Sequence, residues 1–524
     1  MKRAHITIGV ILSFILLAVH LAVVDDYGIT WDFHHHFFAG LYHMGIPLRE
    51  ELTRQIPFTV PDPRGTYALP FGPLMLIAPA VTYRIFHELT GILAFDNAYH
   101  LAIIIQSTAG IFVLYLFLLE AFGFATGLAG LAFLALLPRY WGDLHNNMKD
   151  APQAAAFALA IYLFWRLARN RRLRDLAWAS VAFAVAFNTK VNTLMVPVIA
   201  GAWMAGNAIF NARLRRSSVR PPNFFFPFLY FITAPAAAVL LWLPFWQDPI
   251  DRLVYMFRFF LDNTQNLEVL YFGTVYKSAI DVPWHYPLGY LAITTPLPIL
   301  IFFIVGLIGI VIQFLRKIFN FQISNLFLLF LWFFLPLSRY LNPKIGVIDG
   351  IRHFEEVVYP LSAIAAVGAV WLLGRIKNIP VIIFIIVITV IIIIKDIIAF
   401  HPYQISYFNE LTGGIRGAQG AFDVEYWGTS QKAAMRWINK NAPKDSFVHV
   451  LMAGDAAAKY LRPDLLAHVN QKGFDAADYV VILNRESFFD RYWGSRDYMA
   501  RHKPVFSVSV GGVPLTMMYE TRKQ

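Results

Sequence analysis

The sequence contains no cysteine among its 524 residues, and only 15% of its residues are charged. Without cysteine, disulfides and thiolate chemistry are excluded, and the redox state of the compartment cannot be inferred. A soluble chain of this length would need more charge to cover its surface. Hydrophobic residues make up 58% of the chain, and they come in runs long enough to cross a bilayer. The sequence therefore predicts a polytopic α-helical membrane protein.

Positive charge exceeds negative charge by 11 at neutral pH. In a soluble protein this excess would suggest nucleic acid as a partner. Here the basic residues lie in short clusters between apolar runs, as in RLARNRRLR at 166–174 and RLRRSSVR at 213–220. Such clusters are typical of cytoplasmic loops. We therefore predict no nucleic-acid partner, and we use the clusters to orient the chain.

The alternation of apolar runs and basic clusters predicts about 11 transmembrane helices with the N-terminus inside. The basic start at Lys2 and Arg3 precedes a long apolar run without an obvious cleavage site, which indicates a retained signal anchor. Large outer loops are expected at about 25–97 and 247–288, and the first should hold interfacial helices, with 69–86 as one candidate. The spans are expected at about 5–24, 99–119, 121–138, 151–167, 176–189, 192–210, 226–246, 289–314, 325–337, 356–373 and 380–399.

The composition changes after residue 400. Short apolar runs such as SFVHVLMA, YVVILN and VFSVSV alternate with a helical stretch, TSQKAAMRWINKNA. This alternation is typical of a small α/β domain. We therefore expect a transmembrane domain over 1–400 and an extracytoplasmic α/β domain over 401–524.

Ionisable residues gather at the outer ends of the expected spans. Interfacial solvation would explain any single one, but two acidic clusters and two cations on one side favour a shared cavity. The candidates are Asp25, Asp26 and Asp32 after the first span, Asp143, His145, Lys149 and Asp150 before the fourth, Lys190 after the fifth, and Arg352 and His353 before the tenth.

The stretch DDYGITWDFHHHFFAG, at 25–40, supplies acids that could take a proton from an acceptor hydroxyl held nearby. Its three adjacent histidines, His34 to His36, invite a metal interpretation. Neighbouring histidines rarely all face one ion, however, and no Cys-x-x-Cys partner exists. The stretch is therefore interpreted first as a source of a general base.

The stretch GDLHNNMKD, at 142–150, places two acids seven residues apart, which is one face of a helix. Asp143 and Asp150 could hold a divalent ion or orient an acceptor. Asp150 could instead be the N-cap of the fourth span, with Pro152 in the first turn. Lys190 and Arg352 suit a phosphate, because arginine binds two oxygens at once and lysine adds a point charge. Lys190 alone is also explained by snorkelling at a span end.

Several stretches together resemble the GT-C superfamily of membrane glycosyltransferases, of the protein O-mannosyltransferase and aminoarabinose transferase type. They are ITWD at 29–32, HNNMKD at 145–150, NTK at 188–190, GIRHF at 350–354, HPYQISYFNELTGG at 401–414 and DVEYWGTSQKAAMRWI at 423–438. The resemblance covers most of the membrane part, and the final 80 or so residues match no family pattern.

The resemblance implies inverting transfer of a sugar from a polyprenyl-phosphate carrier in the membrane lipid to a hydroxyl of a protein, lipid or glycan. It implies a site outside the cytoplasmic (inner) membrane. Asp32 matches the acid of the first outer loop, where Phe33 replaces the glutamate that often follows, so Asp25 or Asp26 could hold the role instead. Asp150 matches the second acid. The other implied residues are Lys190, Arg352 and His353 for the carrier phosphate and Tyr407, Asn409 and Glu410 in an outer signature.

The remaining candidates line the same face. His145 and Lys149 are expected as a wall of the site, together with Tyr407, Asn409 and Glu410. A divalent metal is left open, with Asp32, Asp150 and His145 as its ligands. Two other functions also stay open: a lipid or sugar transporter or flippase, and a non-catalytic membrane subunit of a glycan-assembly complex. A transporter would be expected to show internal repeats and polar groups near the bilayer midplane.

Overall fold

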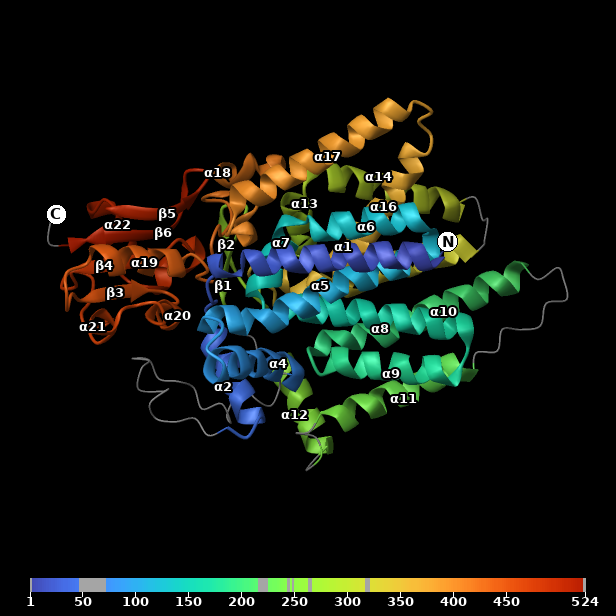
Figure 1. Cartoon of the computed structure of the whole chain (residues 1–524), viewed down its shortest axis with the longest axis horizontal. Coiled ribbons are helices and arrows are strands. Elements are labelled where there is room, and N and C mark those ends of the chain that lie inside the picture. The colour runs from blue at the N-terminus through green and yellow to red at the C-terminus, as the bar shows by residue number, and fades with distance from the viewer. Residues whose placement is uncertain are drawn as a thin grey trace.

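Seven helices of the described chain are long and apolar enough to cross a membrane, or up to eight if a bent pair counts as one span. The computed structural model describes residues 2–46, 72–214, 225–242, 246, 249–262, 266–315 and 321–521. The long helices are α1 (Lys2–Ala22), α5 (Phe95–Phe122), α8 (Asp150–Asn170), α14 (Leu297–Leu315), α15 (Phe321–Ser338), α16 (Val358–Leu373) and α17 (Ile379–Phe400). They run side by side along the molecule (Figure 1). The polytopic helical fold is confirmed.

Burial separates the helices at the centre of this bundle from those that face outward. Only 11% of the apolar window of α1 and 22% of that of α17 are buried inside the protein, against 72% for α8. Apolar side chains that the protein does not cover require lipid around them. Three further helices lie at the expected fifth, sixth and seventh spans: α9 (Leu173–Phe187), α10 (Met195–Leu214) and α11 (Phe225–Leu241). The number of 11 spans stays a prediction.

Prolines interrupt two of the expected spans. The third span ends early: α6 (Phe124–Ala135) is bent by 63° from α7 (Pro138–Asn146). The eighth is split into α13 (Tyr286–Thr294) and α14, so the candidate span begins at Leu297 and not at 289 as expected. A residue before proline avoids the helical region. Leu137 and Thr295, which precede Pro138 and Pro296, are both extended. The bend between α6 and α7 directs the polar stretch at 142–150 toward the interior of the protein, where most of its residues are buried.

Two glycines allow α14 and α16 to pack closely. A Cβ atom on Gly306 would lie 2.2 Å from the carbonyl oxygen of Ile364, and one on Gly368 would lie 2.1 Å from that of Phe302. Small residues permit such close approach between helices in a membrane. By contrast, a Cβ atom on Gly309, also in α14, would meet nothing within 4 Å.

We expect Gly368→Leu to separate α14 from α16 and to lower stability by about 1–3 kcal/mol, the usual range for overpacking. Gly309→Leu is the matched control, since it adds the same side chain where there is room. Thermal melting of the purified proteins in detergent measures the difference. Equal melting temperatures for the two variants would contradict the close packing.

The two loops expected on the outer side contain their own secondary structure. The first loop holds four short helices: η1 (Val24–Asp26), α2 (Phe33–His43), α4 (Pro73–Tyr83) and η2 (Arg84–Leu89). The second loop holds the helix α12 (Pro249–Asp262) and an antiparallel hairpin of β1 (Glu268–Tyr271) and β2 (Thr274–Lys277). The helix expected within 69–86 begins at Pro73, and residues 69–71 lie outside the described part. It buries Met75, Leu76 and Ala80, and it packs on α2, where a Cβ atom on Gly40 would lie 2.2 Å from the carbonyl oxygen of Leu76.

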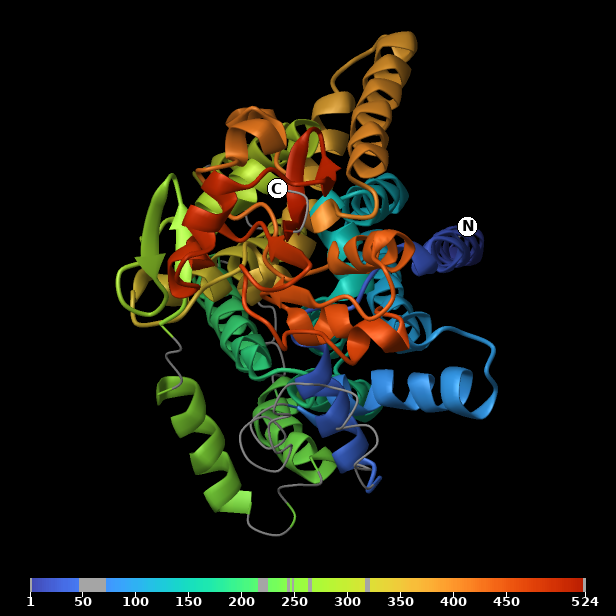
Figure 2. The same ribbon diagram turned by 90° about the vertical axis from the view of Figure 1, so that its left-hand side faces the viewer.

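A mixed four-stranded sheet forms the end of the chain, in the order β3-β4-β6-β5. Its strands are β3 (Val448–Leu451), β4 (Tyr479–Leu483), β5 (Phe506–Val510) and β6 (Val513–Glu520). The helix expected in TSQKAAMRWINKNA is α19 (Gln431–Asn441). The three predicted strand runs are confirmed, and β6 was not predicted. The sheet lies at the end of the bundle opposite the N-terminus of α1 (Figure 1), and it covers that end when viewed along the bundle (Figure 2).

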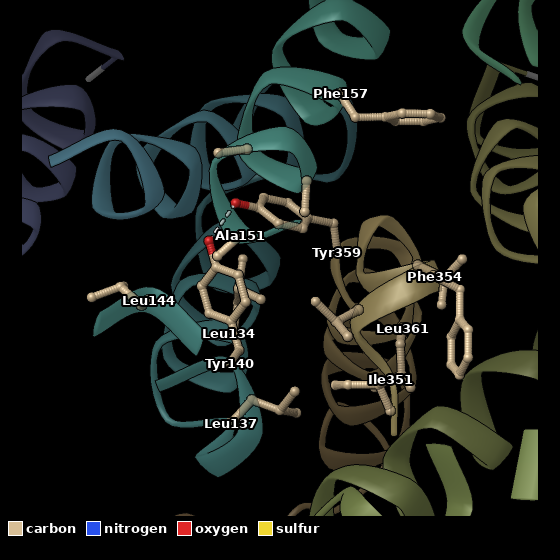
Figure 3. Close-up of a cluster of buried hydrophobic side chains, with 14 of the residues drawn as sticks. Leu134, Leu137, Tyr140, Leu144, Ala151, Phe157, Ile351, Phe354, Tyr359 and Leu361 are labelled. Carbon is tan, nitrogen blue, oxygen red and sulfur yellow. Dashed lines mark hydrogen bonds between the residues drawn. The ribbon is translucent and has the colours of Figure 1, made fainter. Parts of the chain in front are cut away.

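A buried cluster joins α7 to α16. The hydroxyl oxygens of Tyr140 and Tyr359 lie 2.7 Å apart, and that of Tyr140 also donates to the carbonyl oxygen of Ser107 at 3.1 Å. Figure 3 shows the two rings meeting through their hydroxyls, with Leu134, Leu137 and Leu144 on the side of Tyr140. Because the cluster ties α7 to α16, it brings the polar stretch at 142–150 next to the segment that carries Arg352.

Candidate active site

Charged side chains from four separate parts of the chain meet where the bundle joins the C-terminal part. Asp32 directly precedes α2, and Asp150 is the first residue of α8, directly after Lys149. Lys190 follows α9, and Arg352 begins the short helix η6 (Arg352–Val357). The expected convergence of these residues is confirmed.

Asp32 is held by two cations. Its Oδ2 atom lies 2.9 Å from Lys149 Nζ and 3.1 Å from Arg352 Nη1. Lys149 Nζ also lies 3.3 Å from His36 Nε2. The Asp32 side chain is 28% exposed, whereas that of Arg352 is 8% exposed. Asp32 is therefore a carboxylate that a molecule entering from outside can reach.

Burial and charge act on Asp32 in opposite directions. Burial alone would raise the pKa of its carboxyl, but the positive charges of Lys149 and Arg352 hold the pKa well below its usual range. Burial and Lys149 lower the pKa of His36 to about 3. At neutral pH Asp32 is thus ionised, and His36 is a neutral imidazole that accepts a hydrogen bond from Lys149.

A second ion pair lies beside the first. Asp150 Oδ1 is 2.5 Å from Lys190 Nζ, and the Asp150 side chain is 2% exposed. Asn147 Nδ2 lies 3.1 Å from Asp150 Oδ2, 3.3 Å from Asp143 Oδ1 and 3.4 Å from Glu355 Oε2. The side chain of Asn147 therefore joins three buried carboxylates.

Two expectations about these acids are wrong. Asp143 and Asp150 do not share one helix, because α7 ends at Asn146 and α8 begins at Asp150. Asp150 is not the N-cap residue of α8, a position that Lys149 occupies, and no side-chain cap is formed there. The carboxylate of Asp150 binds Lys190 and Asn147 instead, which leaves it with a role in the ion-pair network.

The alternative acids Asp25 and Asp26 bind other partners. Asp25 lies 3.4 Å from Lys432 and 3.3 Å from Arg436, both in α19, and Asp26 lies 2.9 Å from His401. Lys432 Nζ also lies 2.7 Å from the buried Asp96 Oδ2. These contacts attach the C-terminal part to the bundle, whereas Asp32 alone of the three acids contacts Arg352.

Three of the expected wall residues, His145, Tyr407 and Asn409, make contacts with residues other than the ion pairs described above. His145 stacks on Tyr27, with ring centroids 3.8 Å apart and planes 2° apart. Tyr407 donates a hydrogen bond to Asp396 at 2.9 Å. Asn409 Nδ2 donates to the carbonyl oxygens of residues 292 and 295. Glu410 begins η8 (Glu410–Thr412) on the surface, and a role of these four residues in the wall of the site stays a prediction.

His353 contributes its backbone to the network. Its carbonyl oxygen accepts hydrogen bonds from Asn192 Nδ2 at 3.2 Å, Arg339 Nη2 at 2.7 Å and the Tyr340 hydroxyl at 2.9 Å. Arg339 also pairs with Glu356 at 2.9 Å. These bonds fix the turn that carries Arg352. A phosphate contact by the imidazole of His353 stays a prediction.

No group of three or more histidines, cysteines or acids in the described chain is arranged to hold a metal ion. Asp32 and Asp150 are each engaged by cations, and His145 packs on Tyr27. The adjacent histidines point apart, since His34 lies 3.3 Å from Asp455 and His36 lies beside Lys149. The residues expected as metal ligands therefore do not form one ligand set in this structure.

Sequence reasoning missed several residues of the network. Asn147 was not singled out, although it stands between the two named acids. Asp349 and Glu355 flank Arg352 in DGIRHFEE, and their proximity to it was a usable signal. Arg485 pairs with Asp349 at 2.8 Å, although the two residues are 136 positions apart in the sequence. No local sequence pattern identifies Arg485 as part of the site.

Comparison with known proteins finds a family model that matches part of the chain and solved structures of similar fold. The family model of dolichyl-phosphate-mannose-protein mannosyltransferase matches residues 76–242. A search of curated proteins by sequence finds no match. Apo ArnT from Cupriavidus metallidurans is 10% identical, with a TM-score of 0.52 over 99% of each chain.

Two further solved structures are similar. ArnT from Cupriavidus metallidurans bound to undecaprenyl phosphate is 10% identical, with a TM-score of 0.50 over 99% of this chain and 98% of that chain. The archaeal oligosaccharyltransferase AglB from Archaeoglobus fulgidus, in complex with an inhibitory peptide and a dolichol-phosphate, is 14% identical, with a TM-score of 0.47 over 92% of this chain and 69% of that chain. The chain has the fold of the ArnT structures, and its resemblance to GT-C membrane glycosyltransferases of the mannosyltransferase and aminoarabinose transferase type is confirmed.

Proposed function

We propose that the protein transfers a sugar from a polyprenyl-phosphate carrier to an acceptor hydroxyl on the outer face of the inner membrane, with inversion at the anomeric carbon. The observation that carries the proposal is the contact of Asp32 with Arg352, at 3.1 Å. This contact puts a reachable carboxylate next to a cation suited to phosphate. The family match and the fold shared with ArnT, which has been solved with undecaprenyl phosphate, support the lipid-linked donor.

Arg352 and Lys190 bind the donor phosphate in this proposal. Both are paired with carboxylates, so the phosphate competes with Asp32 and Asp150 for them. When the bond between the anomeric carbon and the phosphate oxygen breaks, negative charge grows on the departing polyprenyl phosphate. Cations fixed beforehand stabilise that charge without reorganisation.

Asp32 takes the acceptor proton as the acceptor oxygen forms its bond to the anomeric carbon. Its low pKa keeps the Asp32 carboxylate ionised but makes it a weak base. The proton is therefore transferred late in the reaction, when bond formation to the anomeric carbon has made the attacking hydroxyl acidic. Asp32 is chosen over Asp150 because its side chain is 28% exposed and that of Asp150 is 2% exposed. Asp150 orients Lys190.

We further propose that residues 1–400 form the membrane domain and that residues 401–524 form an extracytoplasmic domain. Asp32 directly precedes α2, which lies toward the end of the molecule that carries the C-terminal sheet and away from the N-terminus of α1 (Figure 1). Arg352 contacts both Asp32 and Asp349, and Asp349 pairs with Arg485 of the C-terminal part. With the basic N-terminus inside, this arrangement supports an outward-facing site.

The direct test uses membranes that contain the protein, with labelled polyprenyl-phosphate mannose and labelled polyprenyl-phosphate aminoarabinose as donors. We expect label to leave the carrier lipid, and polyprenyl phosphate to be released, faster than in membranes without the protein. Proteoliposomes then separate the transporter alternative. Movement of the intact labelled lipid across the bilayer without cleavage would contradict the transferase and favour a flippase.

Lys149 should control the acid side of the pH profile. Lys149→Met removes the cation 2.9 Å from Asp32, so the pKa of Asp32 should rise toward its usual range. Transfer requires ionised Asp32, and the variant should therefore lose kcat/KM at a higher pH than the unaltered protein as the medium is acidified. Initial rates from pH 4 to 8 measure this. An acid limb at the same pH in both proteins would argue against Asp32 as the base.

A further inference from the structure

Arg485 connects the C-terminal part of the chain to the candidate active site. It lies between β4 and η9 (Glu486–Arg491), and its Nη2 atom is 2.8 Å from Asp349 Oδ1, with both side chains 4% exposed. The other oxygen of Asp349 is 3.1 Å from Arg352 Nη2. A single carboxylate thus joins an arginine of the C-terminal part to the arginine assigned to the donor phosphate.

The position of Arg485 is fixed by its surroundings. Asn484, directly before it, donates from its backbone to Leu515 at 2.8 Å and from its side chain to Pro514 at 2.7 Å. Arg485 Nη1 donates to the carbonyl oxygen of Tyr426 at 2.8 Å, and the guanidinium lies 3.6 Å from the ring centre of Phe488. A guanidinium held on several sides loses little freedom when it binds a carboxylate.

The loop around Trp427 adds a second contact from the C-terminal part. The guanidinium of Arg352 lies 4.7 Å from the ring centre of Trp427, a cation–π distance. The carboxylate of Glu425 accepts hydrogen bonds from the backbone nitrogens of Trp427 at 2.8 Å and Gly428 at 3.0 Å, which fixes this loop. The carbonyl oxygen of Trp427 accepts from the nitrogen of Trp31, beside Asp32, at 2.7 Å.

We propose that Arg485 is a positioning residue that orients Arg352 through Asp349, so that the C-terminal part completes the donor phosphate site. The inference rests on the function proposed above. Asp349 carries one negative charge and divides it between two guanidiniums. Without Arg485, the negative charge of Asp349 would act on Arg352 alone. Asp349 would then bind Arg352 more strongly, and Arg352 would be less available to the donor phosphate.

Arg485→Gln is the first test, made in the full-length protein. We expect its KM for the polyprenyl-phosphate sugar to rise by about tenfold, a coupling within the range for residues of one ion-pair network, while kcat falls less. Arg485→Lys, which keeps the charge but cannot reach both Asp349 and Tyr426, should recover part of the loss. Adding Asp349→Asn to Arg485→Gln should also lower KM again, because the carboxylate that traps Arg352 is then gone.

The control is Arg491→Gln. Arg491 lies six residues further on, and its Nε atom pairs with Glu268 at 2.6 Å, which links the C-terminal part to the β1–β2 hairpin. A purely structural role for Arg485 predicts the same loss in both variants. Equal KM and kcat for Arg485→Gln and Arg491→Gln, with thermal melting showing both folded, would overturn the inference. If Arg485→Gln does not fold, Arg485→Lys replaces it, and an unchanged KM overturns the inference in the same way.

Binding of undecaprenyl phosphate to the purified protein in nanodiscs separates this inference from the function on which it rests. Binding to the unaltered protein and weaker binding to Arg485→Gln would support both. Binding with equal affinity to both proteins would overturn the role of Arg485 and leave the proposed function standing. Absence of binding to the unaltered protein, together with no donor turnover, would overturn the proposed function itself.

Discussion

Asp32→Asn should lower kcat for sugar transfer by about 10²- to 10⁴-fold, the range for removal of a general base. The amide has nearly the shape of the carboxylate, so the packing before α2 is preserved while the proton acceptor is lost. Arg352, which contacts Asp32, loses an anionic partner and becomes more available to the donor phosphate. We therefore expect KM for the donor to stay equal or fall while kcat collapses. Initial rates at saturating donor measure the effect.

Two variants make the test specific. Asp490→Asn is the control for the substitution itself, because Asp490 is an exposed acid that pairs with Arg496 in the C-terminal part. It should transfer sugar at the normal rate. Asp26→Asn tests the alternative base in the same outer loop, whose partner is His401. Near-normal turnover by Asp32→Asn together with loss of turnover in Asp26→Asn would transfer the role of base to Asp26.

The charge pattern predicted four of the residues that meet at the site. Asp32, Asp150, Lys190 and Arg352 each stand at the outer end of an expected span, and ionisable groups in that position are expected to be paired, solvated or functional. The order of spans could be read because basic clusters alternate with apolar runs. Both signals are local in sequence, and the expectation that these residues meet was drawn from the order of the expected crossings, whose number stays a prediction.

Details that depend on where helices break were harder to predict. The helix face shared by Asp143 and Asp150 required a continuous helix, but the chain leaves α7 after Asn146 and starts again at Asp150. Polar side chains compete with the backbone for hydrogen bonds at such a break. Asn147 does so here, since its Oδ1 atom accepts from the nitrogen of Asp150 at 2.8 Å. The pairing of Asp349 with Arg485 depends on the docking of the C-terminal part, which no sequence period encodes.

Arg352→Gln should have the second-largest effect, a loss of about 10²- to 10³-fold in kcat/KM, as for removal of one preorganised donor to a developing charge. Arg352 is the only one of the named cations that contacts both Asp32 and Asp349. Its loss removes the proposed phosphate contact and leaves Lys149 as the remaining cation of those that contact Asp32. Both KM and kcat should therefore worsen, unlike in Asp32→Asn, where kcat carries the effect. Rates over a range of donor concentrations separate the two patterns.

Arg352→Lys distinguishes charge from geometry at this position. Lysine keeps the positive charge, but a single ammonium cannot replace the Nη1 contact to Asp32 and the Nη2 contact to Asp349 together. We expect it to recover only a small part of the activity lost in Arg352→Gln. Arg416→Gln, at an exposed arginine that bonds to the carbonyl oxygen of Gly511, serves as the control and should be unaffected. Full recovery by lysine would mean that Arg352 acts by charge alone, and orientation of its guanidinium by Asp349 and Arg485 would then contribute nothing to transfer.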